Sequence, residues 1–269
     1  MATQQFINRL TFQDAQAMYA RYDTLKPEHI LYEDLLRILS RTALPIDNVR
    51  AFYNNAILKY YPNEATIKAE FLKKVLFRKK HDITVFELPV GKSRVDLCKV
   101  NGTSIAYEIK TDLDSLKRLD KQISDYQLVF EQVYVICSIF RLAEIQDSIP
   151  ADCGIYAYSS PRRGCYKFEE VRKAISSTQC DAKQQLNVFW ASELKRAFPK
   201  CANMRKDEAI NSIVDMYSST IINEAFKETL KSRFCTQWSF LENNHKDILE
   251  IDYQWFYQSL TSPDLIYGI

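Results

Sequence analysis

Three short apolar runs between residues 83 and 110 constrain the fold of this chain more than any other feature. They span Ile83 to Leu88, Arg94 to Val100 and Ser104 to Lys110, and they are rich in β-branched and aromatic residues. Pro89-Val90-Gly91 separates the first two runs, and Asn101-Gly102 separates the last two. Because Asn and Gly accept positive φ angles, the second break predicts a tight hairpin turn. The sequence therefore predicts three consecutive strands, the last two paired as a hairpin.

Charged side chains lie where the two strands of this hairpin would meet. Side chains alternate between the two faces of a strand, so Asp96 shares a face with Arg94. By the same rule Glu108 and Lys110 share a face that excludes Ile109. If the hairpin pairs, the carboxylates of Asp96 and Glu108 can converge.

This set of residues suits metal-assisted phosphodiester cleavage. Mg²⁺ or Mn²⁺ prefers oxygen ligands, and Asp96 and Glu108 would supply them, with the Ile109 carbonyl as a further ligand. Such a cation lowers the pKa of a bound water, and Lys110 would orient that water or neutralise charge on the phosphate. The alternative is ordinary solvated surface, because a Glu-x-Lys pair on a strand is common. The apolar neighbours favour the first interpretation, since charges are rarely buried without a partner or a metal.

The order helix, three strands carrying D…ExK, helix and strand resembles the PD-(D/E)XK nuclease superfamily, which includes restriction endonucleases, Holliday-junction resolvases and repair nucleases. The string SRVD followed by YEIKTDLDSLKRLDKQISDY is similar to a bacterial branch of that superfamily whose members are mostly uncharacterised. The proline of the superfamily name is absent, since Val95 precedes Asp96. The resemblance implies an α/β fold with a restriction-endonuclease-like αβββαβ core and a mixed sheet. It also implies that Asp96 and Glu108 bind the metal and that Lys110 is the catalytic lysine.

The superfamily has a further acid on its first core helix, which the resemblance places within residues 63 to 78. Glu64 and Glu70 both lie in this range. Glu64 falls within the apolar stripe of the helix and Glu70 points away from it, so Glu64 is the predicted third catalytic acid. The alternative is that Glu64 is only a favourable acid in the first turn of the helix. Glu87, on the strand before Asp96, could be an additional ligand, and the choice among the three acids stays open.

A charged amphipathic helix is predicted from about Ser115 to Glu131, with Asp112 or Asp114 as its N-cap. In the resembled branch one flank of this helix faces the active site. The predicted substrate contacts are therefore the polar residues of that flank and of the strand beside Asp96, namely Arg94, Arg118, Gln122 and Tyr126. The alternative for each of the helical residues is a solvated helix face.

The rest of the chain is predicted to be mostly helical. Residues 1–60 form an N-terminal helical region, residues 61–178 the nuclease-like core, and residues 179–269 a C-terminal helical subdomain. Within the core, strands are expected at 132–137 and 154–158 and a short helix at 168–175. The helical regions are candidates for a homodimer contact or for a partner protein.

Composition excludes several classes of protein. The net charge of +2 provides no strong overall basic field, although basic residues cluster locally. The seven cysteines show no CxxC spacing and the three histidines are scattered, which argues against a structural zinc site. The N-terminal residues MATQQFINRL resemble neither a signal peptide nor an anchor, and the chain has no apolar run of about 18 residues. We therefore expect a cytoplasmic protein with no membrane association, and the resemblance implies a bacterial one.

These observations predict a magnesium-dependent hydrolase of phosphodiester bonds, an endonuclease by the resemblance. DNA is the expected substrate rather than RNA because it is the usual substrate of the superfamily. Two alternatives stay open. One is a non-catalytic module that binds nucleic acid or a partner through the same fold, and the other is an RNA-cleaving, toxin-like nuclease that shares the same site.

Overall fold

The computed structural model describes residues 6–77, 82–177 and 180–268, which form two compact units. The first unit comprises the residues up to Lys74, the segment Ser159–Lys167 and the residues from Ser239 onward. The second comprises Val75–Tyr158 and Phe168–Trp238. Among the described helices, none combines the length and the apolar character that crossing a membrane requires.

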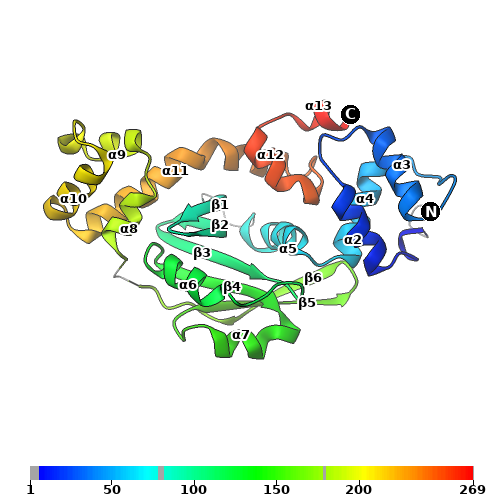
Figure 1. Ribbon diagram of the computed structural model, residues 1–269, viewed down its shortest axis with the longest axis horizontal. Coiled ribbons are helices and arrows are strands. Elements are labelled where there is room, and N and C mark those ends of the chain that lie inside the picture. The colour runs from blue at the N-terminus through cyan, green and yellow to red at the C-terminus, as the bar shows by residue number, and fades with distance from the viewer. Residues whose placement is uncertain (1–5, 78–81, 178–179, 269) are drawn as a thin grey trace. The chain divides into compact units, whose positions relative to one another are not determined.

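A six-stranded sheet, in which spatial neighbours follow chain order, is the framework of the second unit (Figure 1). Its first three strands form an antiparallel meander, whereas the fourth lies parallel to the third and the fifth parallel to the fourth. The mixed sheet with its flanking helices confirms the predicted α/β class. The strands are β1 (Ile83–Val90), β2 (Ser93–Asn101), β3 (Thr103–Lys110), β4 (Gln132–Ser138), β5 (Gly154–Arg162) and β6 (Cys165–Arg172).

The predicted hairpin between β2 and β3 is confirmed. Asn101 pairs with Thr103, and Gly102 alone forms the tip with a φ of +68°. A residue with a side chain rarely adopts this φ, which explains the glycine. The short turn aligns β2 with β3 so that Leu97 lies opposite Tyr107, one position from Asp96 and Glu108.

Helix α6 (Leu119–Gln127) connects β3 to β4 and packs on the sheet through Leu119, Ile123 and Tyr126, each at most 1% exposed. The helix is shorter than the expected 115–131 and has Arg118 at its N-cap position, with no side-chain cap. Asp114 instead accepts hydrogen bonds from the N–H and the hydroxyl of Thr111, both at 2.8 Å. Its carboxylate therefore closes a turn before the helix, which is why the predicted N-cap is wrong.

The predicted short helix over 168–175 is also wrong, because residues 168–172 belong to strand β6 and residues 173–175 form no helix. Gly164 adopts a φ of +78°, which lets the chain reverse so that β6 lies beside β5. Phe168 then packs against Tyr158 of β5, with ring centroids 6.2 Å apart. The local pattern of this segment fits a helix or a strand, and pairing with β5 at the edge of the sheet decided in favour of the strand.

The remaining helices of the second unit extend its core beyond the sheet (Figure 1). Phe189, Phe198 and Phe226 are each at most 1% exposed and belong to the same apolar cluster as the sheet residues. A buried ion pair between Glu193 and Arg233, both 5% exposed, also joins these helices. The helices are α7 (Leu142–Ser148), α8 (Ala182–Asn187), α9 (Ala191–Ala197), α10 (Lys206–Met216) and the first part of α11 (Ser219–Asn244).

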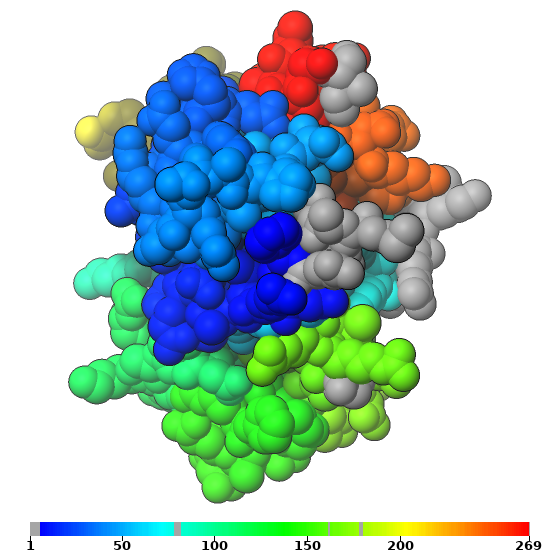
Figure 2. Space-filling model, turned by 90° about the vertical axis from the view of Figure 1, so that its right-hand side faces the viewer, coloured from blue at the N-terminus to red at the C-terminus, as the bar shows by residue number. Residues whose placement is uncertain are grey.

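The first unit consists mainly of helices, with the adjoining ends of β5 and β6 in its segment Ser159–Lys167. Its own apolar core includes Leu31, Phe52 and Tyr53. In the space-filling view its blue N-terminal residues lie beside its red C-terminal residues (Figure 2). Hydrogen bonds from Tyr22 and Thr24 to Asp252 join these distant segments. Its helices are α2 (Phe12–Arg21), α3 (Glu28–Ile38), α4 (Val49–Tyr60), α5 (Glu64–Phe71), α12 (Tyr253–Ser259) and α13 (Pro263–Tyr267), and a π-helical segment (Leu72–Leu76) follows α5.

These two units differ from the three ranges expected along the sequence. Residues from Ser239 onward group with the N-terminal helices, whereas residues up to Trp238 group with the sheet. The physical reason lies in polar contacts within the first unit. The amide of Asn54 donates to Glu250 at 2.6 Å, and Asp252 accepts from hydroxyls near the N-terminus.

Candidate active site on the second unit

Asp96 of β2 is bound to the neighbouring strand through its side chain. The carboxylate accepts a hydrogen bond of 2.6 Å from the backbone N–H of Ile109, and the residue is 9% exposed. The Ile109 side chain is itself 2% exposed. The bond fixes the Asp96 carboxylate at the end of β3 where Glu108 and Lys110 lie.

Glu108 is 1% exposed, and its carboxylate accepts three hydrogen bonds. The Lys110 ammonium and the Gln122 amide donate to one oxygen, each at 2.5 Å, and the Tyr126 hydroxyl donates to the other at 2.8 Å. Lys110 is 8% exposed. A buried charge needs this kind of compensation, because removing a carboxylate from water is costly unless it is paired and hydrogen-bonded.

Tyr126 of α6 joins the two strands of the site. Its hydroxyl lies 2.8 Å from both the Glu108 carboxylate and the backbone carbonyl of Arg94, so its single hydrogen is shared between two acceptors. Burial raises the pKa of Tyr126 far above its usual range, and the charge of Glu108 raises it further. The phenol therefore stays protonated and acts as a donor.

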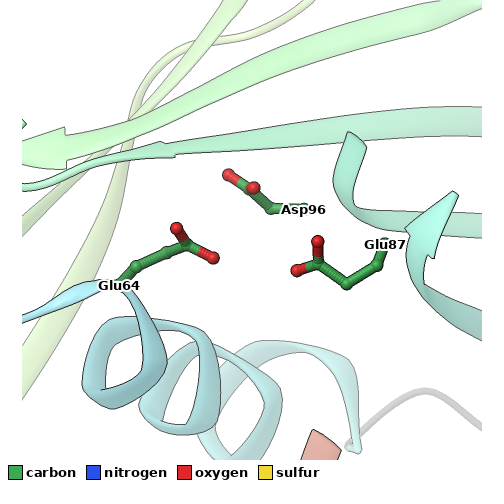
Figure 3. A group of neighbouring side chains, drawn as sticks. All are labelled: Glu64, Glu87 and Asp96. Atoms are coloured by element: carbon green, nitrogen blue, oxygen red, sulfur yellow. The ribbon is translucent and has the colours of Figure 1, made fainter. Parts of the chain in front are cut away.

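Glu87 of β1 lies on the same side of the sheet as Asp96. The ladder pairs Phe86 with Leu97 and Leu88 with Val95, which places Glu87 opposite Asp96. A carboxylate oxygen of each lies within 4.8 Å of the other, and the two side chains point toward one another (Figure 3). The Glu87 carboxylate also forms an ion pair with the guanidinium of Arg94 at 2.6 Å.

Glu87 has an unusual backbone. Its φ of +55° lies in the left-handed region, which residues other than glycine rarely occupy. Such a conformation costs about 1–3 kcal/mol and is found most often at functional sites. The side of the sheet that Glu87 faces could not be predicted, because alternation along this strand does not by itself orient its faces.

Two other predicted substrate contacts, Arg94 and Arg118, are exposed. The Arg94 side chain is 68% exposed even though it pairs with Glu87. Arg118 is exposed at the N-cap position of α6. The structure thus brings Gln122 and Tyr126 to Glu108 and leaves the two arginines facing solvent.

The two acids considered for the first core helix belong to the first unit. Glu64, also drawn in Figure 3, is the first residue of α5, and its 47% exposed side chain pairs with Lys68 at 2.9 Å. Glu70 was expected to point away from the apolar stripe, yet it is 5% exposed and pairs with Lys74 at 2.8 Å. Polar as well as apolar residues of this helix are buried, and the apolar periodicity does not reveal this. The expected exposure of Glu70 therefore differs from its observed burial.

The donor set on the sheet fits a hard divalent cation. Glu87 and Asp96 offer only carboxylate oxygens, the ligands that Mg²⁺ and Mn²⁺ prefer. Glu108 offers two more oxygens, and a cation bound there would compete with three internal donors. Glu87 and Asp96 are thus more accessible to a cation than Glu108 is. Lys110 is held at the end of β3 by its ion pair with Glu108.

Comparison with known proteins places this site within one family. The chain is 27% identical over 157 residues to Protein cII of Enterobacteria phage P4, an alignment that covers 56% of this chain and 59% of that protein. The chain thus spans less than two thirds of the length of this relative. No solved structure matches the chain. The family model of bacteriophage P4 protein cII matches residues 59–254, which is more than half of the chain and includes every candidate site residue. The chain therefore belongs to the bacteriophage P4 protein cII family.

Proposed function

We propose that this protein is a metal-dependent nuclease that hydrolyses phosphodiester bonds, with DNA as its substrate class. The observation that carries the proposal is the buried Lys110–Glu108 pair on β3, with Asp96 of β2 hydrogen-bonded to Ile109 between them. This arrangement supports the D…ExK interpretation of the sequence. The choice of DNA rests on the resemblance to the PD-(D/E)XK superfamily.

The carboxylates have the role of holding the cation. Asp96 and Glu108 are the ligands expected from the sequence, with the Ile109 carbonyl as a further oxygen, and Glu87 adds a carboxylate within 4.8 Å of Asp96. Bound Mg²⁺ or Mn²⁺ supplies Lewis acidity and lowers the pKa of a coordinated water. Glu64 stays a prediction of the sequence as the third acid.

The other residues orient and neutralise charge. The Lys110 ammonium, held at 2.5 Å from Glu108, is a donor for a non-bridging phosphate oxygen and offsets the negative charge that develops there. Gln122 and Tyr126 hold Glu108 in one position, so that neither it nor Lys110 has to reorganise during the reaction. The exposed guanidinium groups of Arg94 and Arg118 are suited to contact phosphates along the nucleic acid.

The test is a cleavage assay with labelled single-stranded, duplex and branched DNA and with RNA, in Mg²⁺, Mn²⁺ or EDTA. We expect metal-dependent cleavage by the wild type and none by Lys110→Ala. A matched control is Lys99→Ala, because Lys99 is 8% exposed, lies on β2 and pairs with Asp82 at 3.0 Å away from Glu108. Cleavage that persists in Lys110→Ala, or that Lys99→Ala abolishes equally, would contradict the proposed role of Lys110.

A second candidate is a non-catalytic module that binds nucleic acid or a partner. The saturation of Glu108 by three internal donors favours it, because such a carboxylate can serve the fold alone. Nucleic-acid binding without cleavage in any metal would select this candidate. Cleavage of RNA but not DNA in the same assay would select a toxin-like ribonuclease instead.

A further inference from the structure

The turn that follows β4 carries an aromatic ring that faces solvent. Residues Ile139–Arg141 form this 3-10 turn, in which Phe140 is 90% exposed and Ile139 is 41% exposed. Phenylalanine contributes to stability mainly by being buried, so Phe140 contributes little to the core. We therefore consider what the turn contacts and which residues lie at the same edge of the sheet.

Hydrogen bonds hold this turn to the loop that follows Lys110. The Ser138 hydroxyl accepts from the Phe140 N–H at 3.3 Å, which fixes the start of the turn. The Arg141 guanidinium donates to the backbone carbonyls of Thr111 and Asp114, both at 2.7 Å. The backbone that carries Phe140 is thereby fixed relative to the end of β3.

The same edge of the sheet carries the proposed catalytic lysine. Lys110 pairs with Cys137 in the parallel ladder between β3 and β4, so both strands end at the same place. Leu113, in the loop after Lys110, is 49% exposed. We call Leu113, Ile139 and Phe140 the apolar rim. The exposed cations Lys117 and Arg118 follow Leu113 along the chain.

We propose that Phe140 stacks on an unpaired base of a nucleic-acid substrate beside the phosphate that Lys110 contacts. The inference rests on the proposed function, and it narrows the substrate to single-stranded nucleic acid or to nucleic acid with unpaired bases. An aromatic ring accepts any base on its face, and nearby cations contact the backbone. A ring on a fixed turn loses little conformational freedom on binding.

The size of the apolar rim favours a base over a protein partner. A stable protein interface buries about 800 Å² on each side and needs a contiguous apolar centre. The rim has three apolar side chains, which is too small a set for such a centre. The residues on either side of Leu113 are the acids Asp112 and Asp114, so the cations suited to the phosphates of the strand are Lys117 and Arg118 further along the loop. A single exposed ring matches one base better than it matches a protein surface.

The experiment measures equilibrium binding of the full chain to labelled single-stranded and duplex DNA of the same sequence, with Ca²⁺ in place of Mg²⁺. We expect Phe140→Ala to bind single-stranded DNA about ten-fold more weakly and duplex DNA nearly as well as the wild type. Phe140→Trp should restore the affinity, and Phe140→Leu should not. Leu265→Ala is the matched control, because Leu265 is 78% exposed and lies in the first unit.

The outcomes separate this inference from the proposed function. Binding that depends on Phe140 without any cleavage in Mg²⁺ would support the stacking role and count against the nuclease. Cleavage by a Phe140→Ala protein that binds single strands as the wild type does would overturn the stacking role alone. Full rescue by Phe140→Leu, an equal loss for duplex DNA, or no binding of nucleic acid by the wild type would also overturn it. Self-association that Phe140→Ala abolishes, without an effect on nucleic acid, would identify the rim as a protein contact instead.

Discussion

Each of the two units buries a carboxylate that accepts several hydrogen bonds, but the donors differ. In the described part of the first unit, Asp252, which is 0% exposed, accepts from the hydroxyls of Tyr22, Thr24 and Tyr267 at 2.7–2.8 Å, and the charge of Arg50 also acts on it. In the second unit Glu108, which is 1% exposed, accepts from an ammonium, an amide and a hydroxyl. Both carboxylates are buried and hydrogen-bonded, so these two properties do not distinguish a structural site from a chemical one.

The difference lies in charge and in the neighbouring acids. The hydroxyls on Asp252 come from segments far apart in the chain, so the carboxylate joins the two ends of the first unit. Glu108 has a lysine two residues away on its own strand and lies one strand from Asp96. A buried ammonium with several carboxylates nearby can bind a cation and a phosphate, whereas an acceptor of hydroxyls stabilises the fold.

The sharpest test of this contrast is Asp96→Asn. The asparagine keeps an acceptor for the Ile109 N–H and removes the charge, so we expect a free energy of unfolding within about 1 kcal/mol of the wild type. Cleavage should fall by about two to three orders of magnitude if the proposal is correct, because Asp96 is a proposed metal ligand. Rates at saturating Mg²⁺ and urea denaturation measure the two quantities. Unchanged cleavage would place Asp96 among the structural carboxylates.

In the first unit, Asp252→Ala should act on stability. It leaves the buried hydroxyl of Thr24 and the half-buried hydroxyls of Tyr22 and Tyr267 without this acceptor, and we expect a loss of about 3 kcal/mol in the free energy of unfolding. The control is Asp264→Ala, an exposed acid on α13, for which we expect a change below about 0.5 kcal/mol. Equal small effects of both substitutions in urea denaturation would show that Asp252 does not join the chain ends.

Tyr126→Phe tests the tyrosine hydroxyl that donates to Glu108. Asp252 also accepts from tyrosine hydroxyls, so this kind of donor occurs in both units. A hydrogen bond to a charged group is worth about 2 kcal/mol, so the variant should lose about that much stability and also cleave more slowly. Tyr134→Phe is the matched control, because its hydroxyl donates to the exposed Glu170 at 2.6 Å in the same unit. We expect a smaller loss of stability there and no loss of cleavage, and equal cleavage by both variants would argue against a positioning role for Tyr126.

Substitution of Glu87 tests the strained backbone. Alanine normally stabilises a strand relative to glycine, but at a φ of +55° the order should reverse. We expect Glu87→Gly to be about 1 kcal/mol more stable than Glu87→Ala in thermal unfolding. Both lose the carboxylate, so both should show the same reduction in metal-dependent cleavage. The usual order of stability would mean that Glu87 leaves the left-handed region once its side chain is removed.

The pH dependence of stability should differ slightly between wild type and Asp252→Asn. Burial raises the pKa of Asp252 above its usual 3.8, so the folded state holds this proton more tightly than the unfolded state. The stability that Asp252 contributes by holding this proton is fully present below pH 3.8, the usual pKa, and is lost as the pH rises through the raised pKa of the folded state. We therefore expect the stability of the wild type relative to Asp252→Asn to fall as the pH increases from 3.8 toward neutrality. A difference that does not change with pH would contradict the raised pKa.

Local sequence pattern was enough to predict the first five strands of the sheet and part of the site. Alternation of side chains and the Asn-Gly break predicted β1, β2 and β3, and an apolar run predicted β4. Because neighbouring strands have a regular register, the meeting of Asp96 with the end of β3 followed from the same pattern. The spacing of Gln122 and Tyr126 on one helix flank also anticipated that both would lie on one side of α6.

Long-range contacts decided what the pattern could not. Pairing with β5 made residues 165–172 a strand, and the hydrogen bonds of Asp114 moved the start of α6 to Leu119. Three further features depend on segments that are far apart in the sequence. They are the left-handed φ of Glu87, the three hydroxyls on Asp252, and the attachment of Phe140 to the loop after Lys110. By itself the sequence determined β1 to β5, the hairpin and the residue types of the site, because these depend on the next few residues. Only the tertiary structure decided which carboxylates are buried and what faces them, because burial depends on segments that meet only in the folded chain.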